Sequence, residues 1–371
     1  MNTTYRPWRI VHSECSLGWG GQEHRVLAEL EGFKRRGCAV WLLAPQEAEV
    51  FKRARAAGIP TQPLNVARLL YPLNALKLAS WLRRNRVQIV NTHSSRDGWL
   101  VGVAARLARL PLVIRTRHID VDYPNRWLSR HAFTTLADHV LTTSARITAH
   151  LQEMFALPDE RISTVPTGID LGCFQPDGPC AELVPRLAQK STPLIGMISV
   201  LRSWKGHPVF LNAAKQLVDA GLKAHFVIVG AGPIRQRIEQ QIAALGLGEV
   251  VTLTGHREDV PEALRALSVL VAPSTAHEGV PQIGLQALAC KTPVVGSDVG
   301  GIPEIIRHGE TGRIFPSGDA GKLAACIRDA MTQTEATAAM TVRGRELVEA
   351  NHSLDGMVQT LDTLYRRKLG A

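Results

Sequence analysis

Short aliphatic runs alternate with amphipathic helical segments along this chain, and after one interruption the alternation begins again. Strands that alternate with helices form right-handed βαβ units and therefore parallel sheets. Nearly continuous apolar runs are typical of strands that are buried on both faces. We therefore predict an α/β protein with two doubly wound, Rossmann-like domains. The runs lie at Arg9–Ser13, Ala39–Ala44, Gln88–Thr92, Leu112–Thr116, His139–Thr143 and Ile162–Val165, and then at 194–201, 224–230, 250–255, 268–274 and 292–297.

The segment 171–193 separates the two series of runs. It contains four prolines and two glycines, a composition typical of an interdomain linker. We predict an N-terminal domain over residues 1–180 and a C-terminal domain over residues 181–353. The remaining segment, 354–371, places Leu354, Met357 and Leu361 on one helical face. Its basic end suits the negative pole of a helix dipole, so we predict a closing helix there.

Composition and charge limit the classes of protein that remain. The 371 residues are 45% hydrophobic and 20% charged, which is typical of a globular chain. The six cysteines are scattered, with no Cys/His cluster at metal-ligand spacing, so we expect reduced thiols in the cytoplasm and no metal site. We expect neither a signal peptide nor a bilayer span. The formal net charge of +10 favours anionic partners or simply a basic, well-solvated surface.

The segment from Ser274 to Glu304 carries the most specific chemistry. The run 268–274 is followed by Glu278-Gly279, which we expect to open a helix. Free N–H groups at a helix start attract anions, and Gly279 lets a ligand approach the backbone closely. Glu278 is then an acceptor for sugar hydroxyls, and Gln286 lies about two turns further along the same helical face. A second glycine pair, Gly300-Gly301, is a candidate for another phosphate-facing loop.

Two cations follow the run 194–201. Arg202 and Lys205 are expected to project from a strand–helix loop, where they would neutralise the charge of a diphosphate leaving group. Considered without the downstream segment, they would more often be two solvated basic residues of a loop.

These motifs resemble the donor-binding region of glycosyltransferase family 4, whose members are retaining enzymes of the GT-B fold. The resemblance extends over essentially the whole chain, most clearly over residues 194–316. It implies two domains that face a central cleft and a C-terminal helix that crosses back to the N-terminal domain. Two positions depart from the family: Gln286 replaces the glutamate that holds the ribose, and Val200 replaces an arginine, for which Arg202 is the available substitute. The matching residues are Glu278, Gly279, Pro281, Pro293, Val294, Val295, Gly300, Gly301 and Glu304.

The resemblance also implies a role for each candidate residue. Arg202 and Lys205 would stabilise the departing diphosphate, while Glu278 and His118 would hold the transferred sugar. The site needs no metal, and because the nucleotide-diphosphate sugar is a substrate, no cofactor is expected. The predicted donor-binding residues are Gly20, Gly21, Gly232, His256, Arg257, Gly279, Val280, Pro281, Gln282 and Gln286.

Several of these assignments have plainer alternatives. Gly18–Gly21 and Gly230–Gly232 are also typical of ordinary strand–helix turns, and residues 256–257 of a surface turn.

A lone histidine is more often structural than functional, so His118 depends on the resemblance. His93, after the run Gln88–Thr92, is a weaker candidate of the same kind. Asp120 and Asp122 would orient His118 or the acceptor, or they would simply be solvated.

We therefore expect a retaining glycosyltransferase that moves a hexose-type sugar from a nucleotide-diphosphate sugar to a glycan or lipid-linked acceptor, in lipopolysaccharide or other cell-envelope polysaccharide synthesis. The segments 73–86 and 97–110 combine apolar residues with arginines, a pattern that is more often typical of ordinary half-buried helices. The excess of basic residues in the N-terminal half favours peripheral contact with an anionic membrane from the cytoplasmic side, and we expect no nucleic acid partner. Three alternatives stay open: a sugar-nucleotide epimerase of the same fold, a non-catalytic nucleotide-sugar binding protein and, from charge alone, a nucleic-acid binder. These motifs do not specify the base, the sugar or the acceptor.

Overall fold

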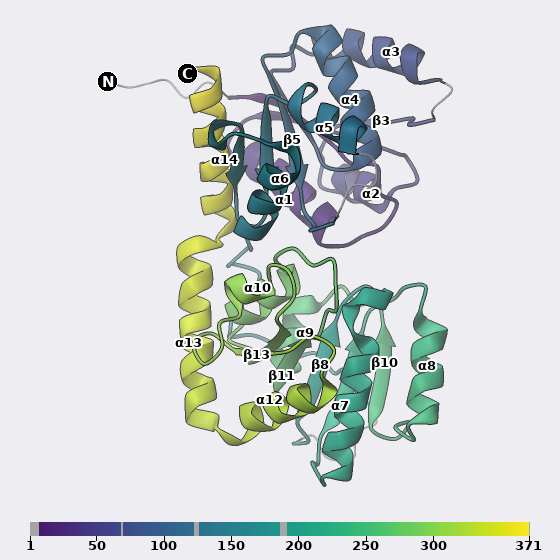
Figure 1. Ribbon diagram of the computed structural model, residues 1–371, viewed down its shortest axis with the longest axis vertical. Coiled ribbons are helices and arrows are strands. Elements are labelled where there is room, and N and C mark those ends of the chain that lie inside the picture. Colours follow the sequence, from purple (N-terminus) through teal and green to yellow (C-terminus); the bar gives the residue numbers. More distant parts are fainter. Residues whose placement is uncertain (1–6, 68–69, 122–125, 186–190, 371) are drawn as a thin grey trace. The chain divides into compact units, whose positions relative to one another are not determined.

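The computed structural model describes residues 7–67, 70–121, 126–185 and 191–370 (Figure 1). The chain divides into two compact units. The N-terminal unit contains residues 1–168 and 354–371, and the C-terminal unit contains residues 169–353. Each unit is built on its own parallel sheet. The predicted α/β fold with two doubly wound domains is confirmed.

The described part of the N-terminal unit has a seven-stranded sheet of order β3-β2-β1-β4-β5-β6-β7. The strand order reverses between β1 and β4, which is where such sheets bind ligands at the carboxyl ends of their strands. Helices α1, α2 and α14 pack on one face, and α3 and α4 pack on the other. The strands are β1 Arg9–Ser13, β2 Ala39–Ala44, β3 Thr61–Pro63, β4 Ile89–Thr92, β5 Leu112–Arg117, β6 His139–Thr142 and β7 Ile162–Thr164, and the helices are α1 Gly21–Arg35, α2 Glu49–Ala56, α3 Tyr71–Arg84, α4 Ser95–Ala108, α5 Arg126–Thr134, α6 Ala145–Phe155 and α14 Leu354–Leu369.

The last helix belongs to the N-terminal unit although it follows the C-terminal one in the chain. The apolar face of α14 joins the core that α1 covers, and Val358 in it is fully buried. A Cβ atom at Gly32 of α1 would lie 2.4 Å from Val358 Cγ2, so the two helices approach each other closely at this glycine. The Trp8 indole also donates a 2.6 Å hydrogen bond to Asp362 Oδ1. These contacts fix α14 on the first unit.

The described part of the C-terminal unit has a six-stranded sheet of order β10-β9-β8-β11-β12-β13, which reverses between β8 and β11. One hydrophobic cluster includes α7, α8 and α12, and a second includes α9, α10 and α11. The strands are β8 Leu194–Ile198, β9 His225–Val229, β10 Val251–Gly255, β11 Val269–Ala272, β12 Val294–Ser297 and β13 Arg313–Phe315, and the helices are α7 His207–Asp219, α8 Arg235–Ala244, α9 Val260–Ala266, α10 Gln282–Ala289, α11 Ile302–Ile305, α12 Ala320–Thr332 and α13 Thr334–Asn351.

The division between the units differs from the prediction. It falls at Gly168 and Ile169, twelve residues before the predicted boundary at 180/181. The reason is packing: Ile169, Leu171 and Phe174 join a core cluster of the C-terminal unit. The segment 169–180 is therefore part of the second unit, although its prolines and glycines are typical of a linker.

Two strands were not predicted from the sequence. Both β3 and β13 have only three residues and lie at the edges of their sheets. Strand β3 (Thr-Gln-Pro) contains no aliphatic side chain beyond its proline and β13 (Arg-Ile-Phe) contains one, so neither forms a recognisable aliphatic run. Pro63 in β3 is tolerated there because an edge strand has one side without a hydrogen-bonding neighbour.

Candidate functional site

The fold brings the loops after β8 and β11 together, because these strands are neighbours where the strand order of the C-terminal unit reverses. Lys205 ends a short 3-10 helix, Ser203–Lys205, in the first loop, and Glu278 lies in the second. The Lys205 Nζ atom lies 2.8 Å from both carboxylate oxygens of Glu278. Ser274 donates a further bond of 3.0 Å to Oε2. Two residues that were predicted to bind different parts of a donor thus form one ion pair.

This pair is largely shielded from water. The Glu278 side chain is 8% exposed and the Lys205 side chain 24%. Removing one partner from such a pair leaves a desolvated charge, which is strongly unfavourable. A ligand group that replaces Glu278 at the amino group must therefore be anionic. Hydroxyl donors can in turn replace the amino group at the Glu278 carboxylate.

Gly206 explains how Lys205 is held at this position. Its φ of +79° lies in the left-handed region, and a Cβ atom there would lie 1.8 Å from the Pro273 carbonyl oxygen. The neighbouring Thr275 N–H donates a 2.7 Å bond to the Trp204 carbonyl. The loop after β8 is therefore packed directly on the end of β11, and the backbone on both sides of Lys205 is fixed.

The second glycine pair has a packing role that the sequence did not predict. A Cβ atom at Gly300 would lie 1.9 Å from the Glu278 carbonyl oxygen, and one at Gly301 would lie 2.9 Å from the Gly279 carbonyl carbon. The loop after β12 thus presses on the backbone that carries Glu278. Among the described residues, this close approach explains both glycines without a bound phosphate.

The helix in the donor motif begins later than predicted. Helix α10 starts at Gln282, with Pro281 as its N-cap, rather than at Gly279. Glu278 therefore precedes the helix, and the expected two-turn spacing from Glu278 to Gln286 does not apply. Gln282 and Gln286 instead lie one turn apart on the same helical face, and both are half-buried. Val280 is 9% exposed and belongs to the core.

The remaining predicted residues of the C-terminal unit lie at the same edge of the sheet. Arg202 is exposed, with its guanidinium carbon 5.8 Å from the Trp204 ring centroid. A Cβ atom at Gly232 would lie 2.5 Å from the Leu201 carbonyl oxygen, so the loop after β9 packs on the loop after β8.

The turn after β10 is two strands away from β8 in the sheet. His256 bonds to Glu258 at 3.0 Å, and Arg257 bonds to Asp259 at 2.8 and 2.5 Å. The Asp259 carboxylate raises the pKa of Arg257. Both predicted residues thus bond to local carboxylates, and the structure does not bring them to the Lys205–Glu278 pair.

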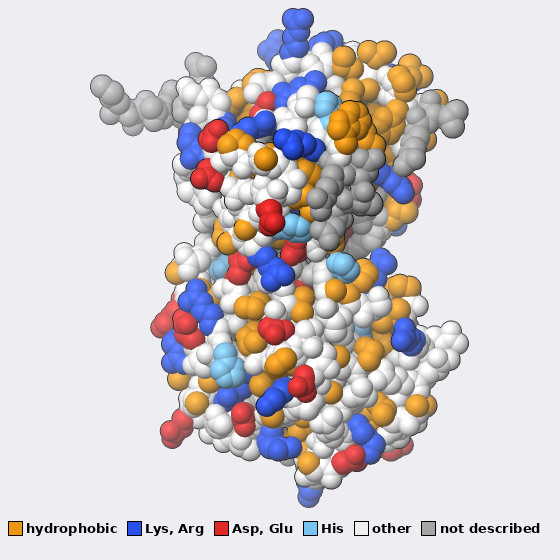
Figure 2. Space-filling model, viewed as in Figure 1, with side chains coloured by type: hydrophobic (Ala, Val, Ile, Leu, Met, Phe, Trp, Pro, Cys, Tyr) orange, Lys and Arg blue, Asp and Glu red, His pale blue; other side chains and the backbone are white. Residues whose placement is uncertain are grey.

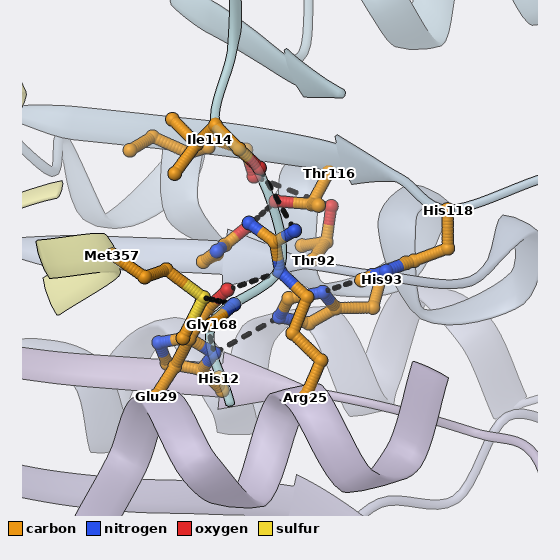
Figure 3. A network of polar contacts seen from close by, with 12 residues as sticks. His12, Arg25, Glu29, Thr92, His93, Ile114, Thr116, His118, Gly168 and Met357 are labelled. Atoms are coloured by element: carbon orange, nitrogen blue, oxygen red, sulfur yellow. Dashed lines mark hydrogen bonds and ion pairs between the residues drawn. The ribbon is translucent and has the colours of Figure 1, made fainter. Parts of the chain in front are cut away.

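In the N-terminal unit, three histidines form a chain along the carboxyl ends of β1, β4 and β5 (Figure 3). His12 Nδ1 lies 2.9 Å from His93 Nε2, and His93 Nδ1 lies 2.9 Å from His118 Nε2. Burial lowers the pKa of His12 to about 4 and holds the pKa of His93 and His118 well below the usual range. The predicted residues His118 and His93 are therefore in contact with each other. His12 was not predicted, because it lies inside a strand.

Other predicted features of this unit have local roles. Helix α1 begins at Gly21, and the backbone N–H of Gly20 donates a 2.8 Å bond to Glu23 of the same helix. Asp120 bonds to Arg146 at 3.0 Å and to His150 at 2.5 Å, so its bonds go to these two residues and not to His118. Asp122 lies outside the described residues.

Two buried carboxylates at the β1–β4 reversal were not predicted. Glu14 follows β1 and bonds to Ser94, which caps α4, while Asp97 accepts bonds from Ser13 Oγ at 2.6 Å and Ser94 N at 3.0 Å. Burial, and then Asp97, raise the pKa of Glu14 to about 7, and burial raises the pKa of Asp97 to about 6. The spacing of Ser94 and Asp97 is a recognisable capping signal, but no sequence pattern points to Glu14.

Comparison with known proteins places this geometry in a family. Residues 19–172 match the family model for glycosyltransferase family 4, and residues 192–333 match the model for glycosyl transferases group 1. A UDP-galactose-dependent galactosyltransferase of Escherichia coli that acts on diphosphoundecaprenol-linked N-acetylglucosamine is 27% identical over 320 residues, covering 81% of this chain and 82% of its own. A lipopolysaccharide core mannosyltransferase of Rhizobium leguminosarum is 26% identical, with coverage of 78% and 80%.

Solved structures agree in fold. A glycosyltransferase of Rickettsia africae superposes with a TM-score of 0.87 at 21% identity, covering 98% of this chain and 99% of its own. The Anabaena protein HepE in complex with UDP and glucose superposes with a TM-score of 0.84 at 20% identity, with coverage of 95% and 98%. Across the described residues, no helix is both long and apolar enough to cross a membrane.

Proposed function

Because the chain belongs to the family 4 glycosyltransferases, we propose that it is a retaining enzyme that moves a hexose-type sugar from a nucleotide-diphosphate sugar to a glycan or lipid-linked acceptor. The observation that carries the proposal is the Lys205–Glu278 pair at the strand-order reversal of the C-terminal unit. One side chain of the pair suits a diphosphate, and the other suits the hydroxyls of the sugar attached to it.

Donor binding exchanges the partners of this pair. The diphosphate oxygens take the place of Glu278 at Lys205, and sugar hydroxyls donate to the freed carboxylate. Arg202, exposed in the same loop, adds a second positive charge. As the bond between sugar and diphosphate breaks, negative charge grows on the departing phosphate, and fixed cations stabilise it in that state more than in the ground state. These side chains neutralise the leaving group without a metal or a cofactor.

Half-buried amides add further contacts for the donor. Gln282 and Gln286, both half-buried on α10, are assigned to the diphosphate and the ribose. His118 of the N-terminal unit is assigned a hydrogen bond to the transferred sugar. Attack by the acceptor from the leaving-group side agrees with a retaining reaction, and Glu278 and His118 are assigned to the sugar hydroxyls rather than to nucleophilic attack.

An apolar and basic surface supports a membrane-linked acceptor. On α3 the side chains of Leu73 and Leu76 are 50% and 60% exposed, and Trp127 on α5 is 75% exposed. Lys77, Arg83 and other exposed basic residues lie on α3 or directly after it, and Figure 2 shows hydrophobic and basic side chains side by side over this region. Exposed apolar residues beside cations suit the interface of an anionic membrane. We therefore assign the acceptor to the cytoplasmic side of a membrane, in cell-envelope polysaccharide or lipopolysaccharide synthesis.

A transfer assay tests this function. The full chain is incubated with UDP-, GDP- and ADP-sugars, with and without membrane lipid extracts that contain lipid-linked glycans. The proposal predicts acceptor-dependent release of the nucleoside diphosphate and retention of the anomeric configuration in the product. Interconversion of the donor without any acceptor would show an epimerase instead. Binding of a donor without turnover in any extract would show a non-catalytic binding protein.

A further inference from the structure

The three histidines of the N-terminal unit are joined edge to edge. Their ring centroids are 5.0 Å apart for His12 and His93 and 5.1 Å apart for His93 and His118, with interplanar angles of 19° and 34°. Such separations, with nitrogens 2.9 Å apart, arise when rings meet along their edges through an N–H···N hydrogen bond rather than face to face. Figure 3 shows the three rings in sequence, connected by these two bonds.

Burial makes all three rings neutral near pH 7, since the pKa of each lies below its usual value. A neutral imidazole has one N–H donor and one acceptor nitrogen. Each contact between two rings needs one protonated and one unprotonated nitrogen. The nitrogen that carries the proton in one ring therefore determines which nitrogen carries it in the next ring. The chain therefore has two arrangements: every N–H points from His12 toward His118, or every N–H points back toward His12.

The surroundings of His12 distinguish these arrangements. Glu29 Oε2 lies 3.7 Å from His12 Nδ1, and a carboxylate favours a proton on the nitrogen that it faces. Among the described residues, His12 Nε2 is buried without a hydrogen-bond partner. A proton there would be a buried donor without an acceptor, which is costly. Both effects place the His12 proton on Nδ1, so that it donates to His93.

The backbone holds the next two rings in line. The backbone N–H of His93 donates to Asp97 Oδ2 at 3.1 Å and to the Ser13 carbonyl at 3.2 Å. Thr143 Oγ1 donates to the His118 carbonyl at 3.3 Å. His93 then donates from Nδ1 to His118 Nε2, and the proton of His118 lies on Nδ1. No described residue bonds to that nitrogen.

We propose that His93 and His12 are positioning residues that fix His118 in the Nδ1–H tautomer, so that its Nδ1 always presents a donor to a sugar hydroxyl oxygen. The inference rests on the proposed role of His118 in donor binding. The charged and titratable groups that face the three histidines are Arg25 and Glu29 of α1, Arg117 of β5 and Asp97 of α4, which accepts from the His93 backbone N–H. Arg25 bonds to Glu29 Oε1 at 2.7 Å and holds this carboxylate in place.

The same residues also have the composition of a metal site. The ligand atoms of His12, Glu29 and His93 lie within 4.8 Å of one another. Two observations favour hydrogen bonding instead. The His12 and His93 nitrogens are already at hydrogen-bond distance. The buried guanidinium of Arg25 neutralises Glu29 and would repel a cation placed beside it.

Nitrogen NMR of the full chain with nitrogen-15-labelled histidine tests the tautomer without reference to activity. Protonated and unprotonated ring nitrogens have well-separated shifts, and comparison with the His118→Gln variant identifies the His118 signals. The proposal predicts a neutral His118 with its proton on Nδ1 near pH 7. A proton on Nε2, or a charged ring, would overturn it. One tightly bound zinc ion per purified chain would overturn it as well, because the metal would take the His12 and His93 lone pairs.

Variants of His93 test whether its hydrogen bond to His118 contributes to turnover. His93→Asn places an amide near the position of Nδ1 and keeps a donor for His118, whereas His93→Leu removes it. Loss of one neutral hydrogen bond predicts a fall in kcat/KM of about tenfold for His93→Leu, with at most about a threefold fall for His93→Asn. The matched control is His139→Leu, because His139 is also buried but begins β6 at the amino edge of the same sheet.

Equal losses for His93→Leu and His139→Leu would mean that His93 is merely structural. If His93→Leu does not fold, the NMR measurement on the unmodified chain still decides the proposal. The two proposals also fail separately. If the protein transfers sugar but His118 carries its proton on Nε2, only the proposal about the three histidines is rejected. If His118 carries its proton on Nδ1 but the protein transfers no sugar, only the proposed function is rejected.

Discussion

At the scale of the residue, the candidate site depends on pairs that no local pattern predicts. Lys205 and Glu278 are 73 positions apart and meet because β8 and β11 are neighbours. Sequence motifs identified both residues, but not their contact, because a motif does not specify which loops become adjacent. The histidine chain is a similar case, since three strands supply its members and His12 lies inside one of them.

Gln286 should accept a glutamate without loss of donor affinity. The side chain is half-buried on α10, one turn after Gln282, and is proposed to bond a ribose hydroxyl. A hydrogen bond to a charged acceptor contributes about 1.5–3 kcal/mol against roughly 1 kcal/mol for a neutral one. Calorimetric titration of Gln286→Glu with the preferred donor should therefore give an equal or lower Kd. A Kd raised tenfold or more would show that Gln286 does not contact the ribose.

Glu14 makes folding stability depend on pH. Its pKa is about 7 in the folded chain, above the value of an exposed glutamate, so the folded state binds more protons than the unfolded state between about pH 4 and 7. The free energy of unfolding therefore falls as the pH rises from about 4 to about 7, because ionising Glu14 costs more in the folded chain than in the unfolded chain. Glu14→Gln removes this dependence, so its Tm relative to the unmodified chain should rise between pH 5 and 8.

The control for this pH series is Glu239→Gln on the exposed face of α8. Differential scanning calorimetry at several pH values measures both variants. A relative Tm of Glu14→Gln that stays constant or falls over this range would show that Glu14 ionises in the fold as easily as in water.

At the scale of the element, glycines position the loops that carry the site. The sequence offered Gly300-Gly301 as a candidate phosphate-facing loop, and the structure shows that both glycines pack closely on the backbone of Glu278 and Gly279. A glycine that accommodates neighbouring backbone cannot be distinguished from one that accommodates a ligand until the neighbouring loop is placed. For the same reason the start of α10 was misplaced, because Glu278 and Gly279 are held by tertiary contacts rather than by a helix.

Gly206→Ala tests whether the packed loop is needed to hold Lys205. Alanine at a positive φ costs about 1–2 kcal/mol, and here its Cβ would also lie 1.8 Å from the Pro273 carbonyl oxygen. Gly221 is a matched control, with a φ of +82° and nothing within 4 Å of the position that an alanine Cβ would take. Urea unfolding should show a clearly larger loss for Gly206→Ala than for Gly221→Ala, together with weaker donor binding. Equal losses would contradict the close contact.

Gly32 tests the packing of α14 on α1. Glycine to alanine inside a helix normally stabilises by about 1 kcal/mol. A Cβ atom at Gly32 would instead lie 2.4 Å from Val358 Cγ2, so we expect Gly32→Ala to destabilise. In a Val358→Ala background the clash disappears, and Gly32→Ala should become neutral or stabilising. A double-mutant cycle by urea unfolding measures this coupling, and additive effects would place α14 away from Gly32.

At the scale of the whole molecule, the architecture was predictable and the division between its units was not. Apolar runs marked every strand of the described residues except the edge strands β3 and β13, because a strand buried on both faces has almost no polar residues. The boundary at Gly168 was missed because composition suggested a linker where Leu171 and Phe174 pack into the second core. The fold and the family could thus be predicted from sequence patterns. The boundary between the units and the contacts between loops could not, because they depend on tertiary packing.

The proposed function requires that Lys205 in the C-terminal unit holds the diphosphate of a nucleotide sugar. Thermal unfolding of the full chain and of Lys205→Ala with UDP-, GDP- and ADP-sugars tests this role, with Lys215→Ala on α7 as the matched control. A ligand that binds only the folded state raises its Tm. We predict that one donor class raises the Tm of the unmodified chain and of Lys215→Ala but not of Lys205→Ala, whose turnover falls about 100-fold or more. An equal Tm increase and near-normal turnover in Lys205→Ala would show that the lysine does not hold the diphosphate.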